Sequence, residues 1–577
     1  MKVQAKKAVA QNEGVLKSRG LGVVTPLFSL LVLLIVLPVG ILLYGAFSKS
    51  PPGEINFAKS NFTLSTVKRV LGSSTLQKST LVTLQVVVIG VIFAVVVATA
   101  LAWLVARTDI PFRRLIGAGV LAPLVISPLV SGIAWSSLGA SRSGLINMVF
   151  RSIGLHFSLN IGTIFGLAFV MGTIYMPYAY LLIIGALRGI DSSVEEAASI
   201  CGANDRQTLS RITFTLIRPA IFASFLLVGV TLMGMYVIPF MLGEPAGILL
   251  LTSYIGRFIL TAPPDLAAAD VIGLCLVIVT AISVVVQNRI LNKRQYTTVS
   301  GKGYRRQRIK LGRFRFIAGG LAIFYMFITV VLPFLAILQV VFAKSPYYTN
   351  LKTILNPHNF SLNNLFIVFR SPGIVRSMTN SLLVGSMAAF FGVILSFMVS
   401  YTRRRTEFRG RGLIETISIM PVAIPSLILG LGFLWAWISL PIGFYGTIYI
   451  LVAAFVAHQM PLGVRSIDGT LMQLHVELEE AARICGASRL KTIVRIVLPL
   501  TRRGTFACAM LFFVISIREI GPILFLYNSH TMVMSGQVLE SWAQGSIATA
   551  ATVAFISAII VAILLGVSKK LFEEEND

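Results

Sequence analysis

The chain has 577 residues, of which 56% are apolar and only 12% are charged, and its mean hydropathy is +0.85. A water-soluble globular protein cannot bury that much apolar surface, so the composition excludes this class and indicates a polytopic membrane protein. The formal net charge of +27 would also suit a nucleic-acid-binding protein, but the basic residues are distributed as membrane topology requires, which predicts no nucleic-acid partner.

A transmembrane helix needs about 20 mainly apolar residues, and the chain contains twelve such stretches. They are too long for barrel strands and lack the alternation of a barrel strand, so they predict an all-α integral membrane protein. With both termini cytoplasmic, roughly three quarters of the 49 Lys and Arg residues fall on the cytoplasmic side, as the positive-inside rule requires. The predicted spans are 26–47, 79–106, 115–138, 160–187, 219–242, 268–288, 316–343, 378–402, 413–437, 446–470, 504–526 and 546–568.

Residues 1–25 form a basic cytoplasmic tail, and the first apolar run is too long for a signal peptide and lacks a good cleavage site, which predicts a retained helix. Pro123 and Pro128 predict a kink in the third span, either because this helix faces a pathway or because of packing alone. Residues 289–315 carry ten Lys and Arg and no acid, so they predict a cytoplasmic linker that suits contact with anionic membrane lipid.

One polar stretch occurs twice. Residues 194–203 read Val-Glu-Glu-Ala-Ala-Ser-Ile-Cys-Gly-Ala, and residues 478–487 repeat eight of these ten positions, 284 residues later. Other short motifs repeat at the same places relative to the spans. Arg-Thr-Asp at 107–109 matches Arg-Thr-Glu at 405–407, and Met-Pro occurs at both 176–177 and 460–461. The chain therefore divides into two homologous six-helix units, 26–288 and 316–577, and because six is even the units share one orientation, as a parallel pseudo-two-fold repeat.

Each copy of the polar stretch predicts a short helix, a turn and a second, basic helix on the cytoplasmic surface. Acidic residues suit the first turn of a helix, the two alanines offer a face for close approach, and the glycine permits a left-handed helix end. The candidate residues are Glu195, Glu196, Ala197, Ala198 and Gly202 in the first copy, and Glu479, Glu480, Ala481, Ala482 and Gly486 in the second.

The order Glu-Ala-Ala-x-x-x-Gly resembles the EAA loop of the inner-membrane permeases of bacterial binding-protein-dependent ABC importers. The resemblance covers the whole chain as two fused permease units and is greatest to ferric iron transport permeases. It implies a multi-pass protein of the cytoplasmic (inner) membrane whose two EAA loops are coupling helices. These helices would dock on a separate cytoplasmic ATP-binding subunit, present in two copies, and Glu196 and Glu480 would pair with basic residues of that subunit.

The resemblance also implies an extracytoplasmic substrate-binding protein that delivers the cargo. The sequence contains no Gly-x-x-x-x-Gly-Lys-[Ser/Thr] motif, so it predicts a permease without cofactors that is not itself an enzyme. Two departures from the family pattern predict that the helices after the two loops differ. Leu498-Pro499 reads Phe-Thr at 214–215 in the first copy, and Arg218-Pro219 reads Arg-Arg at 502–503 in the second.

Ferric iron is the predicted cargo, with thiamine, aminoethylphosphonate and polyamines as alternatives. The five histidines are scattered and predict no metal site. Within the predicted spans, Arg518 and Glu519 stand out, because intramembrane charges are costly and face a cavity or a partner. This pair is either a pathway or gate position or a structural ion pair.

An ion-coupled secondary transporter of the major-facilitator type is the alternative from another class, since it also has twelve spans and parallel halves. Its glycine-containing signature between spans two and three is missing here, where residues 107–114 read Arg-Thr-Asp-Ile-Pro-Phe-Arg-Arg. A channel is a third alternative, but the sequence shows no selectivity-filter pattern.

Overall fold

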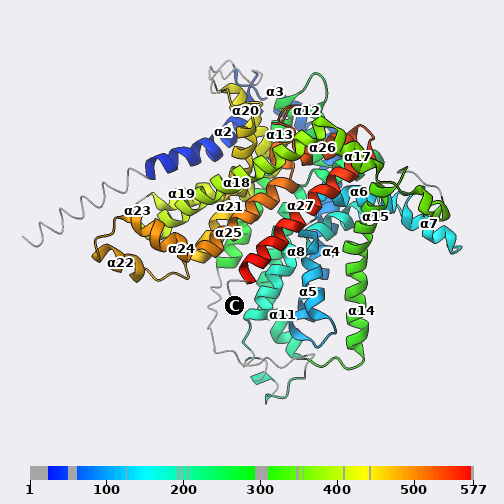
Figure 1. Ribbon diagram of the computed structural model, residues 1–577, viewed down its shortest axis with the longest axis horizontal. Helices are drawn as coiled ribbons and strands as arrows, with labels where there is room; N and C mark the ends of the chain where they lie inside the picture. The colour runs from blue at the N-terminus through cyan, green and yellow to red at the C-terminus, as the bar shows by residue number, and fades with distance from the viewer. Residues whose placement is uncertain are drawn as a thin grey trace, which may run out of the picture. The chain divides into compact units, whose positions relative to one another are not determined.

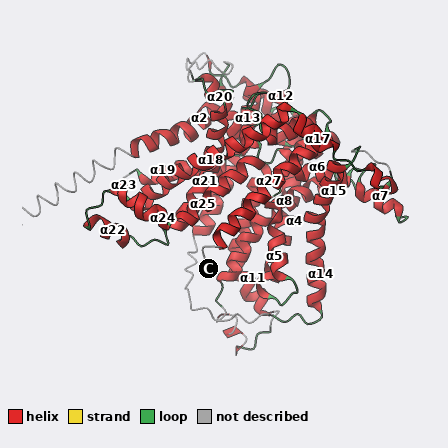
Figure 2. Ribbon diagram, in the orientation of Figure 1, coloured by secondary structure: helices red, strands yellow, loops and turns green. Residues whose placement is uncertain are grey.

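The computed structural model contains helices throughout the residues that it describes, with only three isolated β-bridges there and no strand (Figures 1 and 2). This confirms the predicted all-α class. Most of the predicted basic tail and most of the predicted linker lie outside the described residues. The residues outside the description are 1–23, 50–60, 125, 192–193, 195–196, 199, 205–206, 293–308, 346–349, 355, 407–409, 441–442 and 574–577.

Nine helices in the described part of the chain are long and apolar enough to cross a membrane, and the number rises to twelve if each of three bent pairs counts as one span. The twelve predicted spans correspond to these segments. The nine are Val24–Phe47, Ser74–Arg107, Ile164–Gly189, Thr208–Met233, Leu266–Gln287, Phe314–Phe342, Pro372–Arg405, Ile448–Leu471 and Ile547–Gly566.

Two of the bent pairs replace the predicted spans 115–138 and 413–437, while the bend of the third pair lies before the predicted span 504–526. Their bends are 100° between Arg113–Leu124 and Pro128–Gly139, 114° between Arg411–Ala423 and Ser426–Ser439, and 78° between Arg489–Leu500 and Arg502–Arg518. In the first pair, Pro128 is the first residue of α6 (Pro128–Gly139), and Ser127 caps this helix by accepting a hydrogen bond from the backbone N–H of Leu129 at 3.3 Å. The proline therefore starts a new helix rather than kinking an existing one.

The chain folds into two compact units that differ from the sequence repeat. One unit contains residues 1–64, 376–536 and 560–577, and the other contains residues 65–375 and 537–559. Each unit therefore includes the first span of the other homologous half. The predicted boundaries, 26–288, 289–315 and 316–577, follow the sequence repeat. They remain a prediction about which segments are homologous, while the compact units divide the chain differently.

In the unit of residues 65–375, α4 (Ser74–Arg107) packs along α8 (Ile164–Gly189). A Cβ atom at Gly90 would lie 3.0 Å from the carbonyl oxygen of Ala168, and one at Gly172 would lie 2.9 Å from that of Gly90. Small residues that let two backbones approach closely are the usual device of membrane helix pairs, because lipid supplies no hydrophobic driving force between helices. The other helices of this unit are α3 (Ser65–Leu71), α5 (Arg113–Leu121), α7 (Leu145–Ser152), α11 (Phe214–Met233), α12 (Leu251–Leu260), α13 (Leu266–Asn292), α14 (Phe314–Met326), α15 (Leu332–Phe342), α16 (Leu351–Ile354) and α17 (Asn363–Arg370).

In the other unit, α2 (Leu37–Phe47) packs on α20 (Ser426–Ser439), where a Cβ at Gly432 would lie 2.6 Å from the carbonyl oxygen of Pro38. The ring of Phe512 is almost fully buried against Gly463 and Gly392. It joins three helices, α18 (Pro372–Arg405), α21 (Ile448–Leu471) and α25 (Arg502–Arg518). This unit also contains α19 (Arg411–Ile419), α22 (Glu477–Ile484), α23 (Arg489–Thr492) and α24 (Leu498–Leu500), while α26 (Met534–Ala543) and α27 (Ile547–Glu573) contribute to both units.

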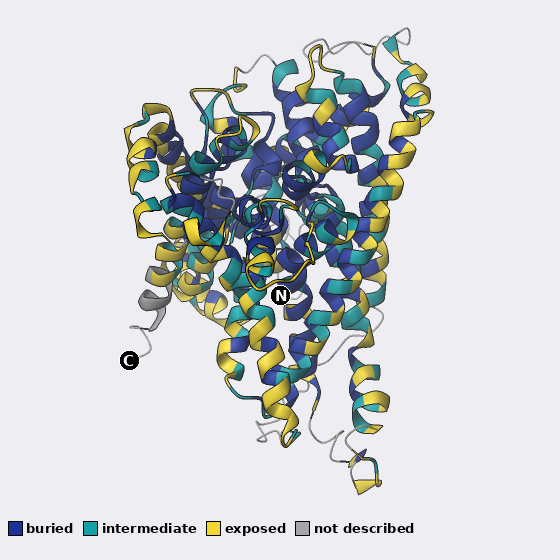
Figure 3. Ribbon diagram, turned by 90° about the vertical axis from the view of Figure 1, so that its right-hand side faces the viewer, coloured by how far each residue is buried: buried dark blue, intermediate teal, exposed yellow. Residues whose placement is uncertain are grey.

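The long helices carry exposed apolar stripes as well as buried ones (Figure 3). On α4 the exposed apolar side chains are spaced three or four residues apart, which places them on one helix face. A lipid-facing helix requires such a stripe, because its apolar side chains contact the hydrocarbon core of the bilayer instead of another helix. The stripe consists of Leu81, Leu84, Val88, Ile92 and Val96.

The last residues of the predicted linker attach to the C-terminal end of α4. The backbone N–H of Ile309 donates to the carbonyl of Arg107 at 3.0 Å, and that of Leu311 donates to the carboxylate of Asp109 at 3.0 Å. Arg315 lies 3.7 Å from the same carboxylate. The Leu311 hydrogen bond, reinforced by Arg315, holds the pKa of Asp109 below its usual value. The linker therefore ends at a fixed point on its own unit.

We predict that Gly172→Val lowers the thermal stability of the detergent-solubilised protein, because its side chain would have to displace the backbone of α4. Overpacking of this kind typically costs about 1–3 kcal/mol. The measurement is the midpoint of thermal aggregation, followed by size-exclusion chromatography. Gly185→Val is the matched control, since Gly185 lies on the same helix with no atom within 4 Å of a Cβ. Equal midpoints for the two variants would contradict the close α4–α8 packing.

Candidate functional site

The second copy of the repeated motif forms a helix that ends in a left-handed glycine. After α22, Gly486 has a φ of +82°, a conformation that side-chain-bearing residues rarely adopt. The backbone N–H of Ala487 donates to the carbonyl of Ala482 at 3.0 Å, and that of Cys485 donates to Ala481 at 3.0 Å. These bonds satisfy carbonyls that the helix end would leave without partners, so the turn is a Schellman-type cap.

The first copy has the same turn. Gly202 has a φ of +85°, and the backbone N–H of Ala203 donates to the carbonyl of Ala198 at 2.9 Å. The N–H of Cys201 donates to Ala197 at 3.0 Å. The predicted glycine turn is therefore present at both places. The two alanines of each motif supply the accepting carbonyls, while Glu195 and Glu196 lie outside the described residues.

A polar residue caps the segment that follows each turn. Ser488 accepts a hydrogen bond from the N–H of Lys491 at 3.4 Å and begins α23. At the equivalent place, Asn204 accepts from the N–H of Gln207 at 2.9 Å, and the Gln207 side chain accepts from the N–H of Asn204 at 3.0 Å. This reciprocal pair is a capping box, so both motifs have a hydrogen-bonded turn and a capped start to the following segment, as far as their residues are described.

The two adjacent glutamates of the second copy point in different directions. Glu479 is buried, with 3% of its surface exposed, and accepts a hydrogen bond from the hydroxyl of Tyr401 at 2.8 Å. Glu480 is exposed, and so is Ile484 one turn later on the same helix face. The sequence had grouped the two glutamates, but only Glu480 is on the outward face of α22.

An exposed isoleucine marks both elements. Ile484 has 86% of its surface exposed, and Ile200, at the same repeat position, has 87%. Single exposed apolar residues are common on protein surfaces. Here two exposed isoleucines occupy equivalent positions of a duplicated element, and in the second copy an exposed glutamate lies beside the isoleucine. Each isoleucine forms a small apolar protrusion that suits a groove in a partner.

The segments after the two turns differ, as the departures from the family pattern predicted. In the first half, a π-helical turn at Thr208–Thr213 runs directly into α11. In the second half, α24 carries Pro499 and stops at Thr501, after which the chain bends by 78° into α25. Proline has no N–H to donate to the preceding turn of a helix, and the turn before Pro499, at Ile493–Val497, is π-helical.

The predicted pathway residues lie at a helix end. Arg518 is the buried last residue of α25, and Glu519 follows it in an extended conformation, so the pair does not lie within a continuous span. A role in the pathway or gate stays a prediction. The sequence analysis overlooked Asp270 in α13, which is fully buried and whose carboxylate oxygens have no hydrogen-bond partner in the described structure. Its position at the start of the predicted span 268–288 was the available signal.

Within the described ranges, no group of three His, Cys, Asp or Glu residues could hold a metal ion. The geometry described at the repeat is that of a duplicated helix–turn–helix element on a helical membrane protein. The sequence analysis also missed Tyr401 and Arg405, which hold the second element in place, and Asp468, which pairs with Arg403 and Arg404.

Comparison with known proteins identifies a matching family, described as the inner membrane component of binding-protein-dependent transport systems. Its profile matches the chain twice, at residues 87–295 and 388–572. A ferric transport system permease protein of Actinobacillus pleuropneumoniae is 27% identical over 454 residues, which cover 77% of this chain and 63% of that protein. A putative ferric transport system permease protein of Haemophilus influenzae is 28% identical over 427 residues, covering 72% and 64% respectively.

A trehalose/maltose transport system permease protein of Thermococcus litoralis is 30% identical over 248 residues, which cover 41% of this chain and 88% of that protein. The chain thus spans most of this relative, but less than two thirds of the length of the two ferric relatives. The double match agrees with the predicted fusion of two permease units.

We predict that Gly486→Val disrupts the second turn, because a side chain in the left-handed region costs roughly 1–2 kcal/mol and a β-branched one more. The expected result is faster tryptic cleavage after Arg489 and Lys491 in inside-out membrane vesicles. Gly469→Val is the control, since Gly469 lies within α21 with nothing within 4 Å of a Cβ and no positive φ. Cleavage of both variants at the wild-type rate would contradict the proposed strain.

Proposed function

The chain belongs to the family of inner membrane components of binding-protein-dependent transport systems, and we propose that it supplies two permease units of an ATP-driven importer. The observation that carries the proposal is the duplicated helix–turn–helix element, which presents the same glycine turn and the same exposed isoleucine in both halves. A permease that responds to two ATPase subunits needs two such docking elements on one face of the membrane.

The proposed partner at these elements is a separate cytoplasmic ATP-binding subunit, present in two copies. The chain has no phosphate-binding Gly-rich motif of its own, so ATP would be hydrolysed by that subunit. Ile484 and Ile200 would enter grooves of the two subunits, and Glu480 would pair with a basic residue at the rim. Glu196 is the counterpart of Glu480 by the repeat, while Glu479 is assigned to holding α22 on the permease instead.

Transport would follow from movement of these elements. Closure of the two ATPase subunits on ATP would displace both elements together and change which side of the membrane the pathway faces. An extracytoplasmic binding protein would deliver the cargo to the opposite face. This assignment places both termini in the cytoplasm, as the distribution of Lys and Arg predicts.

Ferric iron is the proposed cargo, supported by the two relatives that are named as ferric transport permeases. The described part of the chain contains no cluster of metal ligands. We therefore assign cargo recognition to the binding protein, and the permease would supply a pathway that does not coordinate the metal tightly. Thiamine, aminoethylphosphonate and polyamines are the alternative cargoes.

The docking proposal predicts that Ile484→Asp and Glu480→Lys each weaken binding of the ATPase subunit by about tenfold, equivalent to ~1.4 kcal/mol. The measurement is the dissociation constant for the purified ATPase subunit on nanodiscs that contain the full chain. Ile153→Asp is the control, because Ile153 is also well exposed but lies in the predicted outside loop between spans three and four. Unchanged affinity when both elements carry the Asp substitution, at Ile200 and Ile484, would contradict the docking role.

The cargo proposal predicts ATP-dependent accumulation of radioactive ferric iron in cells that express the chain with its ATPase subunit and binding protein. The host strain lacks its own uptake systems for iron and thiamine, and accumulation of labelled thiamine is measured in parallel. Iron uptake should be abolished when the ATPase subunit is inactivated. Accumulation of thiamine without iron would overturn the assignment of cargo but not that of the permease.

A further inference from the structure

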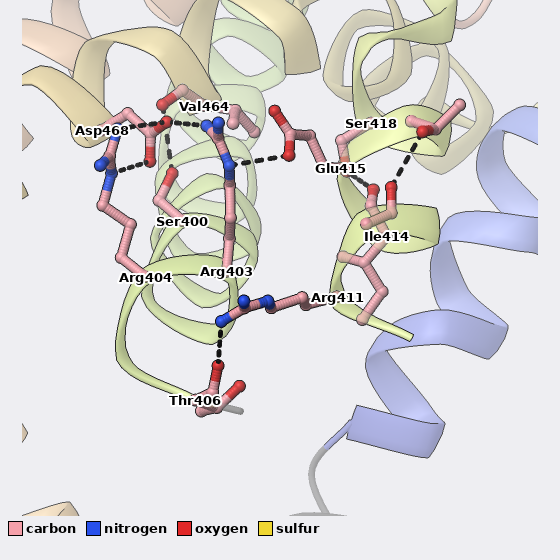
Figure 4. Close-up of polar contacts among 12 residues, drawn as sticks. Ser400, Arg403, Arg404, Thr406, Arg411, Ile414, Glu415, Ser418, Val464 and Asp468 are labelled. Carbon is pink, nitrogen blue, oxygen red and sulfur yellow. Dashed lines mark hydrogen bonds and ion pairs between the residues drawn. The ribbon is translucent and has the colours of Figure 1, made fainter. Parts of the chain in front are cut away.

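Four arginines line one cavity in the second half of the chain. Arg403, Arg404 and Arg405 are the last residues of α18, and Arg411 is the first residue of α19. Figure 4 shows three of them, Arg403, Arg404 and Arg411, where the first of these helices ends and the second begins. The cavity has a volume of about 800 Å³, and the rest of its wall comes from the first turns of α19 and from the stretch 471–476, which leads from α21 to α22.

Acidic side chains hold two of these arginines in place. Arg403 contacts the carboxylate of Glu415 on α19 at 2.8 Å and also that of Asp468 on α21. Arg404 donates to Asp468 from Nε at 3.1 Å and from Nη2 at 3.3 Å. Figure 4 shows Asp468 between the two guanidinium groups. About a third of each arginine side chain is exposed, and Nη1 of Arg404 makes no hydrogen bond to a described residue, so it is available to a further acceptor.

The fourth arginine and a histidine bring donors without an acidic partner. Arg411 is exposed, and its hydrogen bond within the described structure runs from Nη1 to the backbone carbonyl of Thr406 at 3.2 Å. This carbonyl carries no net charge, and no ion pair joins Arg411 to a described acid. His475 is also exposed and lines the same cavity, and its ring makes no hydrogen bond to any residue that the structure describes.

The wall of the cavity carries more positive than negative charge. Arg405 pairs with Glu479 at 3.0 Å, so three acids are paired with three of the four arginines. The residues 407–409, which lie outside the described ranges, contain one acid and one base, Glu407 and Arg409, and leave this difference in charge unchanged. The cavity therefore combines access from water with an excess of cationic donors, which attracts an anion.

The donors of this cavity suit a phosphate group. The guanidinium fork of arginine matches the spacing of phosphate oxygens and forms short, charge-assisted hydrogen bonds with them. A phosphate group has several oxygens, so it can accept from Arg404, Arg411 and His475 together. Met472 and Val476 line the same cavity and are well exposed, which suits the carbon-containing part of a phosphate ester rather than a bare ion.

We propose that this cavity binds the phosphate group of an organic phosphate, held by Arg404, Arg411 and His475. Two sources supply this chemistry, the headgroup of an anionic phospholipid and a soluble phosphate ester. The cavity lies at the predicted cytoplasmic ends of spanning helices, where basic pockets meet phospholipid headgroups. The exposure of its arginines also admits a soluble ester.

The repeat predicts one such site in each chain. Arg411 has a basic counterpart in the first half, Arg113, but Arg404 corresponds to Ala106. His475 corresponds to Asp191, whose negative charge repels a phosphate. The first half thus lacks two of the three proposed ligands, and we expect a single phosphate bound per chain.

The binding test uses the full-length chain in detergent, without any partner. The probes are short-chain phosphatidylglycerol, short-chain phosphatidylcholine and glycerol 3-phosphate, each added at constant ionic strength. A ligand that binds the folded state raises the midpoint of thermal aggregation, and the concentration dependence gives an apparent dissociation constant. We expect saturable binding of phosphatidylglycerol, of glycerol 3-phosphate or of both, and much weaker binding of phosphatidylcholine, whose choline cation cancels the phosphate charge.

Arg411→Gln and His475→Gln should each weaken this binding by about tenfold, because each removes one charge-assisted or polar contact. Both side chains are exposed, so both variants should keep the wild-type midpoint without a probe. Arg495→Gln is the matched control, since Arg495 is an exposed arginine of the same unit that does not line the cavity.

The outcomes separate the two sources and can overturn the site. Binding of phosphatidylglycerol without glycerol 3-phosphate identifies a lipid headgroup, and binding of glycerol 3-phosphate identifies a soluble ester. No shift with any probe would overturn the proposal. Equal shifts with phosphatidylglycerol and phosphatidylcholine, or an equal loss in Arg495→Gln and Arg411→Gln, would do so too, because a general effect of charge or detergent acts without this cavity.

A consequence for transport rests on the proposed function. Val476 lines the cavity and immediately precedes α22, so a bound phosphate would lie against the start of the second docking element. In the reconstituted complex, we expect phosphatidylglycerol in the liposomes, or glycerol 3-phosphate in the buffer, to change the rate of ATP hydrolysis severalfold. Arg411→Gln should remove this dependence and Arg495→Gln should retain it. A rate that ignores both probes would overturn this consequence alone, whereas failure of the ATPase subunit to bind the wild-type chain would contradict the proposed function.

Discussion

The buried arginine at the C-terminal end of the second long helix in each half makes the contact that leads into both helix–turn–helix elements. A helix that leaves an apolar layer exposes carbonyl groups that still need donors. Arg107 and Arg405 supply donors to the last turns of α8 and α21, at Leu187 and Leu471. In the second half the helix–turn–helix element begins a few residues later, and Arg405 also donates to the carbonyl of Leu474 in the connection to it. In the second half, Glu479 compensates the charge of Arg405, so the arginine can be buried without an unpaired charge.

From this point, the shape of each element follows from local chemistry. The alanines allow their carbonyls to accept the N–H groups of the turn, the glycine adopts the left-handed conformation, and Asn204 or Ser488 begins the next helical segment. None of these steps needs long-range packing. This explains how the same turn forms in two halves whose neighbouring helices have diverged, one continuing smoothly into α11 and the other breaking at Thr501.

The sequence therefore predicted the features that depend on local chemistry and missed those that depend on tertiary contacts. The duplicated turn, its glycines, the all-helical class and the twelve apolar segments follow from residue types and spacing. The inward direction of Glu479 does not, because Glu479 and Glu480 are adjacent in sequence and only the position of Tyr401 and Arg405 distinguishes them. The ion pairs of Asp468 could not be predicted for the same reason, because this residue lies within a predicted span and its partners are more than 60 residues away in the sequence. The first span of each homologous half belongs to the compact unit of the other half. This arrangement likewise depends on packing, and no periodic pattern in the sequence predicts it.

The divergence between the halves is concentrated around one preserved contact. Arg107 and Arg405 occupy equivalent positions in the two halves. Two neighbouring positions differ together, being a valine and an isoleucine in the first half and an arginine and an aspartate in the second. Charged residues at buried positions are costly unless their partners are present, so Arg403, Arg404 and Asp468 stabilise one another as a set. The first half has the apolar residues Val105, Ala106 and Ile184 at these positions. The glutamate that pairs with Arg405 is repeated in the sequence, since Glu195 stands where the second copy has Glu479. Divergence after the duplication therefore changed the contacts between the long helices, while both halves kept the arginine and the glutamate of the repeated element.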